Sequence, residues 1–181
     1  MNFKICLVLS LFICSSFAAF LPFPYQQNDA KWRNTLIGFG NKTIGQDGSL
    51  LVSLASLAAG EGIIYKGWLF TPNSMNDWLK LNKGFVNNDQ IVLDSLSPLG
   101  LEYVDTLTNI NEIVHHLIDG KIMIIKLKEG YYAPVFSVVS GGFVVVDPTK
   151  EGTGYYIYAY NYVENVVIYN WNPKYPEIED I

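Results

Sequence analysis

Two hydrophobic periods follow one another along this chain, one typical of helices and one typical of strands. Between residues 50 and 59, the apolar side chains of Leu50, Leu54 and Leu57 recur every three to four residues, and almost no residue is charged. This pattern predicts a helix that is buried nearly all round. Ser49 is predicted to be its N-cap, because a serine hydroxyl can accept a hydrogen bond from a backbone N–H of the first turn, and Gly60 is predicted to end it.

Three more helices are predicted outside this segment. The stretch Thr71-Pro72-Asn73-Ser74 is typical of a helix start, and this helix is expected to reach about Asn82. A short helix is expected over Asp89–Ser95 and another over Asn109–Asp119. Residues 38–48 are rich in glycine and polar side chains, which predicts a loop.

The second half of the chain is predicted to form a β-sheet. Five runs rich in β-branched and aromatic residues are separated mostly by Gly, Pro or Asn, and Ser140-Gly141-Gly142 is typical of a tight hairpin. These predicted strands are Lys121–Leu127, Ala133–Ser140, Gly142–Val146, Tyr155–Tyr160 and Asn165–Tyr169. Helices followed by antiparallel strands predict an α+β fold.

The first residues, MNFKICLVLSLFICSSFA, are typical of a secretory signal peptide. Lys4 supplies the positive start, Ile5–Phe12 the apolar run, and Ser16-Phe17-Ala18 the small residues of a cleavage site. A membrane anchor is the alternative, but the apolar run is shorter than the roughly 20 residues that a span needs. We therefore expect cleavage after Ala18 and a secreted mature protein without a membrane span.

The composition fits one globular domain, which we place at residues 19–170, followed by an acidic tail over residues 171–181. Of the 181 residues, 50% are hydrophobic and 14% are aromatic, which is enough for a core. Both cysteines, Cys6 and Cys14, lie in the predicted signal peptide. The mature chain is therefore expected to have no disulfide, no thiol nucleophile and no cysteine-bound metal.

The charge of the mature chain limits its partners. Without the signal peptide, 11 basic residues stand against 17 acidic residues, a net charge of −6. An acidic surface argues against binding to nucleic acid. Asn41-Lys42-Thr43 is a glycosylation sequon in a glycine-rich stretch, which predicts a glycan on Asn41 if the host glycosylates its secreted proteins.

Few residues are candidates for catalysis or metal binding. His115 and His116 are adjacent on a predicted helix, so their side chains point about 100° apart and cannot both face one site. No cluster of acidic or histidine residues at ligand spacing accompanies them, and neither a metal nor a cofactor is predicted. A nucleophilic Ser49 would need a base within hydrogen-bond reach, so we favour the cap. Asp147, before Pro148, is by itself typical of a turn.

The order of several motifs is more informative than any one of them. It runs through YQQNDAKW (Tyr25–Trp32), IGQDGSLLVSLASLAAG (Ile44–Gly60), TPNSMNDWLKLNKGFV (Thr71–Val86), GKIMIIKL (Gly120–Leu127) and VFSVVSGGFVVVDPT (Val135–Thr149). This order resembles the papain-fold cysteine peptidases related to the bacteriocin-processing, double-glycine-leader peptidases, over roughly Tyr25–Tyr169. The resemblance implies a papain-like fold, in which an N-terminal helical part with a buried central helix packs on a C-terminal antiparallel sheet.

Four positions correspond to the active site of this family. The resemblance places Gln27 at the glutamine of the oxyanion hole and Asp147 at the acid of an Asn-Asp-Pro turn. Ser49, after Gly48, stands where the family has its catalytic cysteine, and Val135 stands where it has its histidine. A serine would need a base and a valine cannot accept a proton, so the resemblance argues against peptidase activity.

Three functions are therefore compared. We expect a secreted, catalytically inactive peptidase-like protein that holds a peptide or protein partner in the former groove or on an aromatic surface. The alternative is an active hydrolase with Ser49 as nucleophile and His115 or His116 as base. A third possibility is a purely structural extracellular component. In the first case Ser49, Val135 and Asp147 are expected to lie together at the start of the buried helix.

Overall fold

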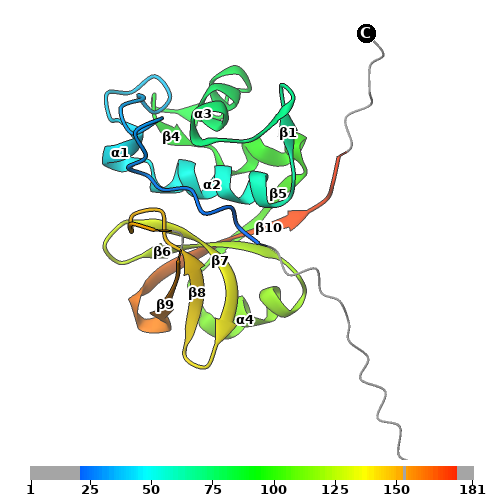
Figure 1. Ribbon diagram of the computed structural model, residues 1–181. Coiled ribbons are helices and arrows are strands. Elements are labelled where there is room, and N and C mark those ends of the chain that lie inside the picture. The colour runs from blue at the N-terminus through cyan, green and yellow to red at the C-terminus, as the bar shows by residue number, and fades with distance from the viewer. Residues whose placement is uncertain (1–20, 153, 175–181) are drawn as a thin grey trace, which may run out of the picture.

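The computed structural model describes residues 21–152 and 154–174, apart from the side chains of Val114, Leu117 and Ile118. These residues form a mixed α+β structure, as predicted. Helices and short hairpins pack on one face of a six-stranded antiparallel sheet (Figure 1). Helix α4 (Ile110–Ile118) lies on the other side of the sheet.

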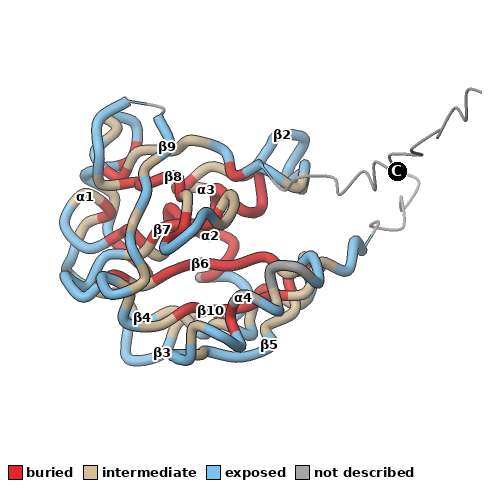
Figure 2. Tube along the Cα trace, turned by 90° about the horizontal axis from the view of Figure 1, so that it is seen from below, coloured by how far each residue is buried: buried red, intermediate tan, exposed pale blue. Residues whose placement is uncertain are grey.

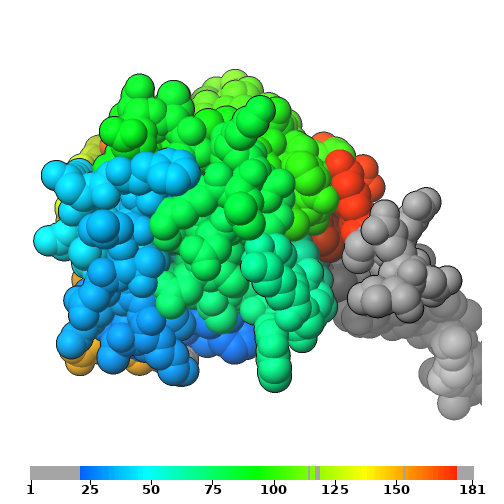
Figure 3. Space-filling model, turned by 90° about the horizontal axis from the view of Figure 1, so that it is seen from above, coloured from blue at the N-terminus to red at the C-terminus, as the bar shows by residue number. Residues whose placement is uncertain are grey.

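The helical part is built around one buried helix. Every residue from Leu51 to Ala59 is buried, which confirms the predicted burial nearly all round. The elements of this part are α1 (Ile44–Asp47), α2 (Ser49–Gly60), the hairpin β1 (Ile64–Tyr65) with β2 (Trp68–Leu69), α3 (Pro72–Leu81), the hairpin β3 (Phe85–Val86) with β4 (Gln90–Ile91), and the 3-10 helix η1 (Leu93–Leu99). Seen from above, this part forms most of the surface, coloured blue to green (Figure 3).

The sheet has the strand order β5-β10-β6-β7-β8-β9. Its strands are β5 (Leu101–Leu107), β6 (Ile122–Leu127), β7 (Tyr132–Val139), β8 (Gly142–Val146), β9 (Tyr155–Ala159) and β10 (Val163–Trp171). All five predicted strands are confirmed. The predicted hairpin joins β7 to β8, and Gly141 there has a φ of 84°, a conformation that glycine adopts without strain.

The helix predictions have mixed outcomes. Helix α3 begins as predicted: Pro72 is its first residue, and Thr71 Oγ1 accepts a hydrogen bond from the Ser74 N–H (3.2 Å). The predicted helix over Asp89–Ser95 is wrong, because β4 and the start of η1 occupy that segment. Gln90 and Ile91 pair with β3 instead, so their backbone groups bond to a neighbouring strand and not within a helical turn.

Two clusters of apolar side chains lie on opposite faces of the sheet. Successive residues of a strand point to opposite faces, so Ile122 and Ile124 of β6 join α2 and α3 in the first cluster. Met123 and Ile125 join the second cluster, together with Ile113 of α4. The buried stretches of α2 and of strands β6 to β8 run through the middle of the molecule (Figure 2).

The ends of the domain follow the predictions in part. Trp171, which was assigned to the acidic tail, still belongs to β10 and pairs with Leu101 of β5. The predicted signal peptide, residues 1–18, and residues 175–181 lie outside the described residues. Among the described helices, none has the length and apolar character required to cross a membrane.

Candidate functional site

The start of α2 is set by its close contact with α1. Gly48 ends α1 and is also the N-cap of α2, and its N–H donates to the carbonyl of Ile44 (2.8 Å). A Cβ at residue 48 would lie 2.4 Å from that Ile44 oxygen, so the junction requires glycine. The prediction that Ser49 is the N-cap is therefore wrong. Ser49 is the first residue of the helix, and its side chain makes no capping bond.

Ser49 instead bonds to the sheet. Its Oγ accepts a hydrogen bond from the backbone N–H of Tyr132 in β7 (3.1 Å), and Ser49 is only 4% exposed. The next serine on the same side of the helix, Ser53, donates to the carbonyl of the same Tyr132 (3.2 Å). A third, Ser56, donates to the carbonyl of Phe23 in the N-terminal segment (2.5 Å). All three hydroxyls therefore attach α2 to neighbouring backbone.

These three serines form a stripe, which we call the serine stripe. They stand at positions i, i+4 and i+7 of α2, and this spacing places side chains on one face of a helix. This spacing is a local signal in the sequence SLLVSLAS, and a prediction based on Ser49 alone does not use it. The Ser49 hydroxyl thus makes the same kind of contact to backbone as the hydroxyls of Ser53 and Ser56.

Gln27 is held rigidly beside this helix start. The residue is 3% exposed; its backbone N–H donates to the carbonyl of Pro148 (2.7 Å), and its Nε2 donates to the carbonyl of Gly45 (3.0 Å). This bond fixes the amide orientation, because a carbonyl can only accept. Gln27 Oε1 is buried without a protein partner. A glutamine of an oxyanion hole must donate to its ligand; Nε2 carries two N–H donors, and one of them donates to Gly45.

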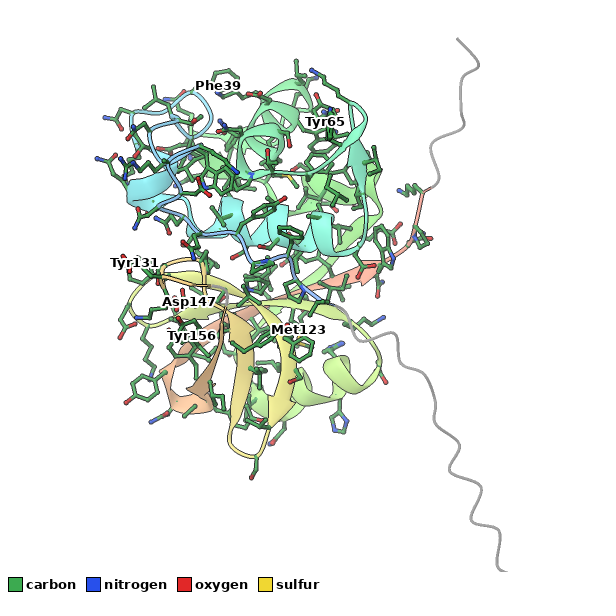
Figure 4. The ribbon with its side chains drawn as sticks, in the orientation of Figure 1. Phe39, Tyr65, Met123, Tyr131, Asp147 and Tyr156 are labelled. Atoms are coloured by element: carbon green, nitrogen blue, oxygen red, sulfur yellow. The ribbon has the colours of Figure 1, made fainter. Side chains whose placement is uncertain are left out.

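A polar pocket of about 310 Å³ lies next to Gln27. It is lined by Gln27, Asn28, Gly45, Gln46, Tyr131, Thr149 and Lys150. Figure 4 shows Tyr131 at the border between the helical part and the sheet. Most of its lining is carboxamide, hydroxyl or backbone, so the pocket offers hydrogen bonds to a neutral polar ligand.

The Asp147 carboxylate accepts hydrogen bonds from its own turn and from the neighbouring strand β9. One oxygen accepts hydrogen bonds from the N–H (2.8 Å) and the hydroxyl (2.7 Å) of Thr149, and the other accepts one from the Tyr158 hydroxyl. Burial, together with this bond to Asp147, raises the pKa of Tyr158 well above the ordinary tyrosine value. Asp147 is therefore an acceptor for its own turn, which agrees with the simple interpretation of the Asp-Pro sequence.

Val135 faces away from α2. Its side chain is buried in the second cluster, and it pairs with Val145 of β8. On β7, Tyr132 packs against the first cluster, so the odd-numbered Ala133 and Val135 point to the other face. The expectation that Val135 lies with Ser49 at the helix start is wrong for this reason: the sheet separates the two side chains.

Of the four predicted positions, the structure connects Gln27 with the turn after Asp147, through the Gln27–Pro148 hydrogen bond. Ser49 is connected to Tyr132, and Val135 belongs to the other core. Among the described residues, no hydrogen bond joins Ser49 to Gln27, Val135 or Asp147. The four predicted residues thus form no hydrogen-bonded catalytic group, and the side chain of Val135 belongs to the other core.

The two histidines lie on the far side of the sheet from Ser49. Both belong to α4, whose Ile113 packs in the second cluster (Figure 1). His115 is exposed, and His116 is half-buried with its Nδ1 lacking a protein partner. Neither imidazole can reach the Ser49 hydroxyl across the sheet.

The two remaining predictions concern a glycan and a metal. Asn41, the predicted glycan site, is exposed in the loop before α1. Among the described residues, no group of three or more His, Cys, Asp or Glu side chains could hold a metal ion.

The described residues therefore define a class: an α+β protein with a six-stranded antiparallel sheet and a buried helix bonded to it through serines. Comparisons of the chain with protein-family models, with curated proteins and with solved structures find no match.

Proposed function

We propose that this protein is a secreted, catalytically inactive relative of the papain-fold peptidases, with a binding or structural role. The order of the elements supports the relationship. The buried helix begins at Ser49, directly after Gly48. It packs on an antiparallel sheet in which Asp147-Pro148 follows β8. The N-terminal apolar segment supports secretion.

One observation carries the proposal of inactivity: the Ser49 hydroxyl is used as an acceptor for the Tyr132 N–H. A serine becomes a nucleophile when a base removes its proton. Here the histidines belong to α4 on the opposite side of the sheet, and Val135 faces the second cluster. Loss of the nucleophile–base pair removes several orders of magnitude of rate in triad enzymes.

The polar pocket beside Gln27 supports a binding role. Its lining presents carboxamide and hydroxyl groups of Asn28, Gln46 and Thr149, which can accept hydrogen bonds from a ligand. The rim residues Tyr131 and Lys150 are exposed and available to a partner. We propose an extended peptide segment of a partner protein as the ligand, because its backbone supplies N–H donors at regular intervals.

A serine-reactive fluorophosphonate probe tests the proposal of inactivity. We expect intact-mass spectrometry to show no adduct on the folded protein, and a casein digest to show no cleavage, while trypsin treated in parallel is fully labelled. A covalent adduct at Ser49 that the Ser49→Ala variant abolishes would show that the protein is an active hydrolase.

A further inference from the structure

The two edges of the six-stranded sheet differ in how they are protected. A free strand edge exposes backbone N–H and C=O groups, and proteins usually guard it with charges, proline or a bulge. The β5 edge carries Glu102 and Asp105, and its pairing with β10 is irregular between Ile168 and Tyr169. The β5 edge is therefore guarded in the usual way.

The β9 edge has none of these protections. Its sequence, YYIYA, has no charge and no proline, and its register with β8 is continuous from Tyr155 to Ala159. No charged residue occurs in the stretch from Gly154 to Val163, in a chain whose net charge is −5. Two copies of this acidic protein could approach along this strand without like-charge repulsion from the strand itself.

The hydrogen bonds between β8 and β9 show which backbone groups of β9 point away from the sheet. The Tyr160 N–H donates to the carbonyl of Gly141 (3.1 Å), at the end of the β8–β9 ladder. In an antiparallel ladder, alternate residues bond to the same neighbour, so Tyr156 and Tyr158 also bond toward β8. The N–H and C=O groups of the three intervening residues therefore face away from the sheet. These residues are Tyr155, Ile157 and Ala159.

The strand is self-complementary about Ile157. We propose that a second copy of this chain pairs with β9 antiparallel, edge to edge, about a two-fold axis that passes beside Ile157. In this register Ile157 lies opposite Ile157 of the partner subunit, and each Tyr155 lies opposite the small Ala159, so that large and small side chains alternate across the axis. Ile157 is 67% exposed and Tyr155 is 49% exposed in the isolated chain.

The expected dimer is weak and depends on concentration. A five-residue strand pair buries less surface than the roughly 1,200 Å² at which stable specific interfaces begin. Backbone hydrogen bonds would provide most of the contact, as in other complexes that extend a sheet. The proposal concerns the sheet edge and does not depend on whether Ser49 is reactive.

Analytical ultracentrifugation of the purified protein, from about 10 μM to about 1 mM, tests the proposal. We expect the average mass to rise from that of a monomer toward that of a dimer. Ile157→Lys should keep the protein monomeric, because it places two like charges beside the axis. Val104→Lys is the matched control, since Val104 is exposed on the other edge strand, and it should associate as the wild type does.

Hydrogen exchange gives the residue-level measurement. The amides of Tyr155, Ile157 and Ala159 should exchange more slowly as the protein concentration rises, whereas those of β5 should not change. A wild-type protein that stays monomeric at every concentration would overturn the proposal. Association that Ile157→Lys leaves intact, or that occurs without slower exchange in β9, would also overturn it.

Discussion

The two faces of the sheet are joined to their helices by different kinds of contact. On one face, α2 packs in the first cluster and is also bonded to backbone through the serine stripe. On the other face, α4 contributes Ile113 to a second cluster, whose rim carries the Tyr158–Asp147 hydrogen bond. Ser49 and Val135 belong to different faces, so motif order alone does not bring these two predicted site residues together.

The largest expected effect tests whether the two faces unfold together. Leu54 and Phe143 are both fully buried, one in each cluster. Leu54→Ala is expected to lower the free energy of unfolding by about 2–5 kcal/mol and Phe143→Ala by about 3–5 kcal/mol, through lost burial and a new cavity. Urea unfolding measures both.

Two probes sharpen this experiment. The tryptophans Trp32 and Trp78 lie in the first cluster, so their fluorescence reports mainly on the helical part, while far-UV circular dichroism reports on the whole chain. For one cooperative domain the two transitions should coincide in both variants. If Phe143→Ala shifts only the circular dichroism transition, the two faces are separate folding units.

Ser49→Ala tests the serine stripe on the α2 face. It leaves the Tyr132 N–H without its acceptor in a region that is largely buried, so it should cost about 1–3 kcal/mol of unfolding free energy. The control is Ser95→Ala, whose hydroxyl donates to Val92 at the surface, and the expected change there is about 0.5 kcal/mol or less. Equal effects of the two substitutions would contradict a structural role for Ser49.

Tyr158→Phe tests the polar bond on the other face. Burial and the Asp147 carboxylate raise the pKa of Tyr158 in the folded state, so the folded protein holds this proton more tightly than the unfolded chain does. The resulting stabilisation is present below about pH 10, the ordinary tyrosine pKa, and is lost as the pH rises through the folded-state value. The variant should be less stable by about 1–2 kcal/mol at pH 8, because Tyr158 is only half-buried.

Unfolding measured from about pH 8 to about pH 11 separates this effect from a general alkaline loss of stability. The buried Tyr169, whose pKa is also raised by burial, keeps its contribution in both proteins. The stability of wild type should therefore fall more steeply above pH 10 than that of Tyr158→Phe. Parallel curves would show that the Tyr158 proton is not linked to folding.

The smallest expected effect concerns α4. His115 is exposed, so His115→Ala should change the unfolding free energy by about 0.5 kcal/mol or less and leave the fluorophosphonate result unaltered. If the probe labelled the wild type but not His115→Ala, His115 would be identified as a base. That result would contradict its position across the sheet from Ser49.

Much of the fold could be predicted because its signals are local. The apolar period after Ser49 and the five β-branched runs each determine their own element. Strand β5 was missed because its charged residues Glu102 and Asp105 interrupt the alternation of a half-buried strand. The two short hairpins were missed because their strands have only two residues each and carry no period.

The candidate site was less predictable, since it depends on register between distant elements. No feature of the sequence near Val135 shows which face of the sheet receives its side chain, because the alternation of the whole strand decides this. Likewise the partner of Ser49 is a backbone group 83 residues away. The serine spacing on α2 was the one local signal that could have indicated a structural role.

The central claim is that Ser49 acts as a structural acceptor for the Tyr132 N–H, and hydrogen exchange of that amide tests it most directly. In the wild type the Tyr132 amide should be protected to the same degree as its neighbours in β7. Ser49→Ala should accelerate exchange of the Tyr132 amide by more than it accelerates exchange of the β10 amides. Ser53→Ala removes a bond to the Tyr132 carbonyl, so it should have little effect on exchange of the Tyr132 amide. Exchange of the Tyr132 amide that Ser49→Ala leaves unchanged relative to β10 would contradict the account.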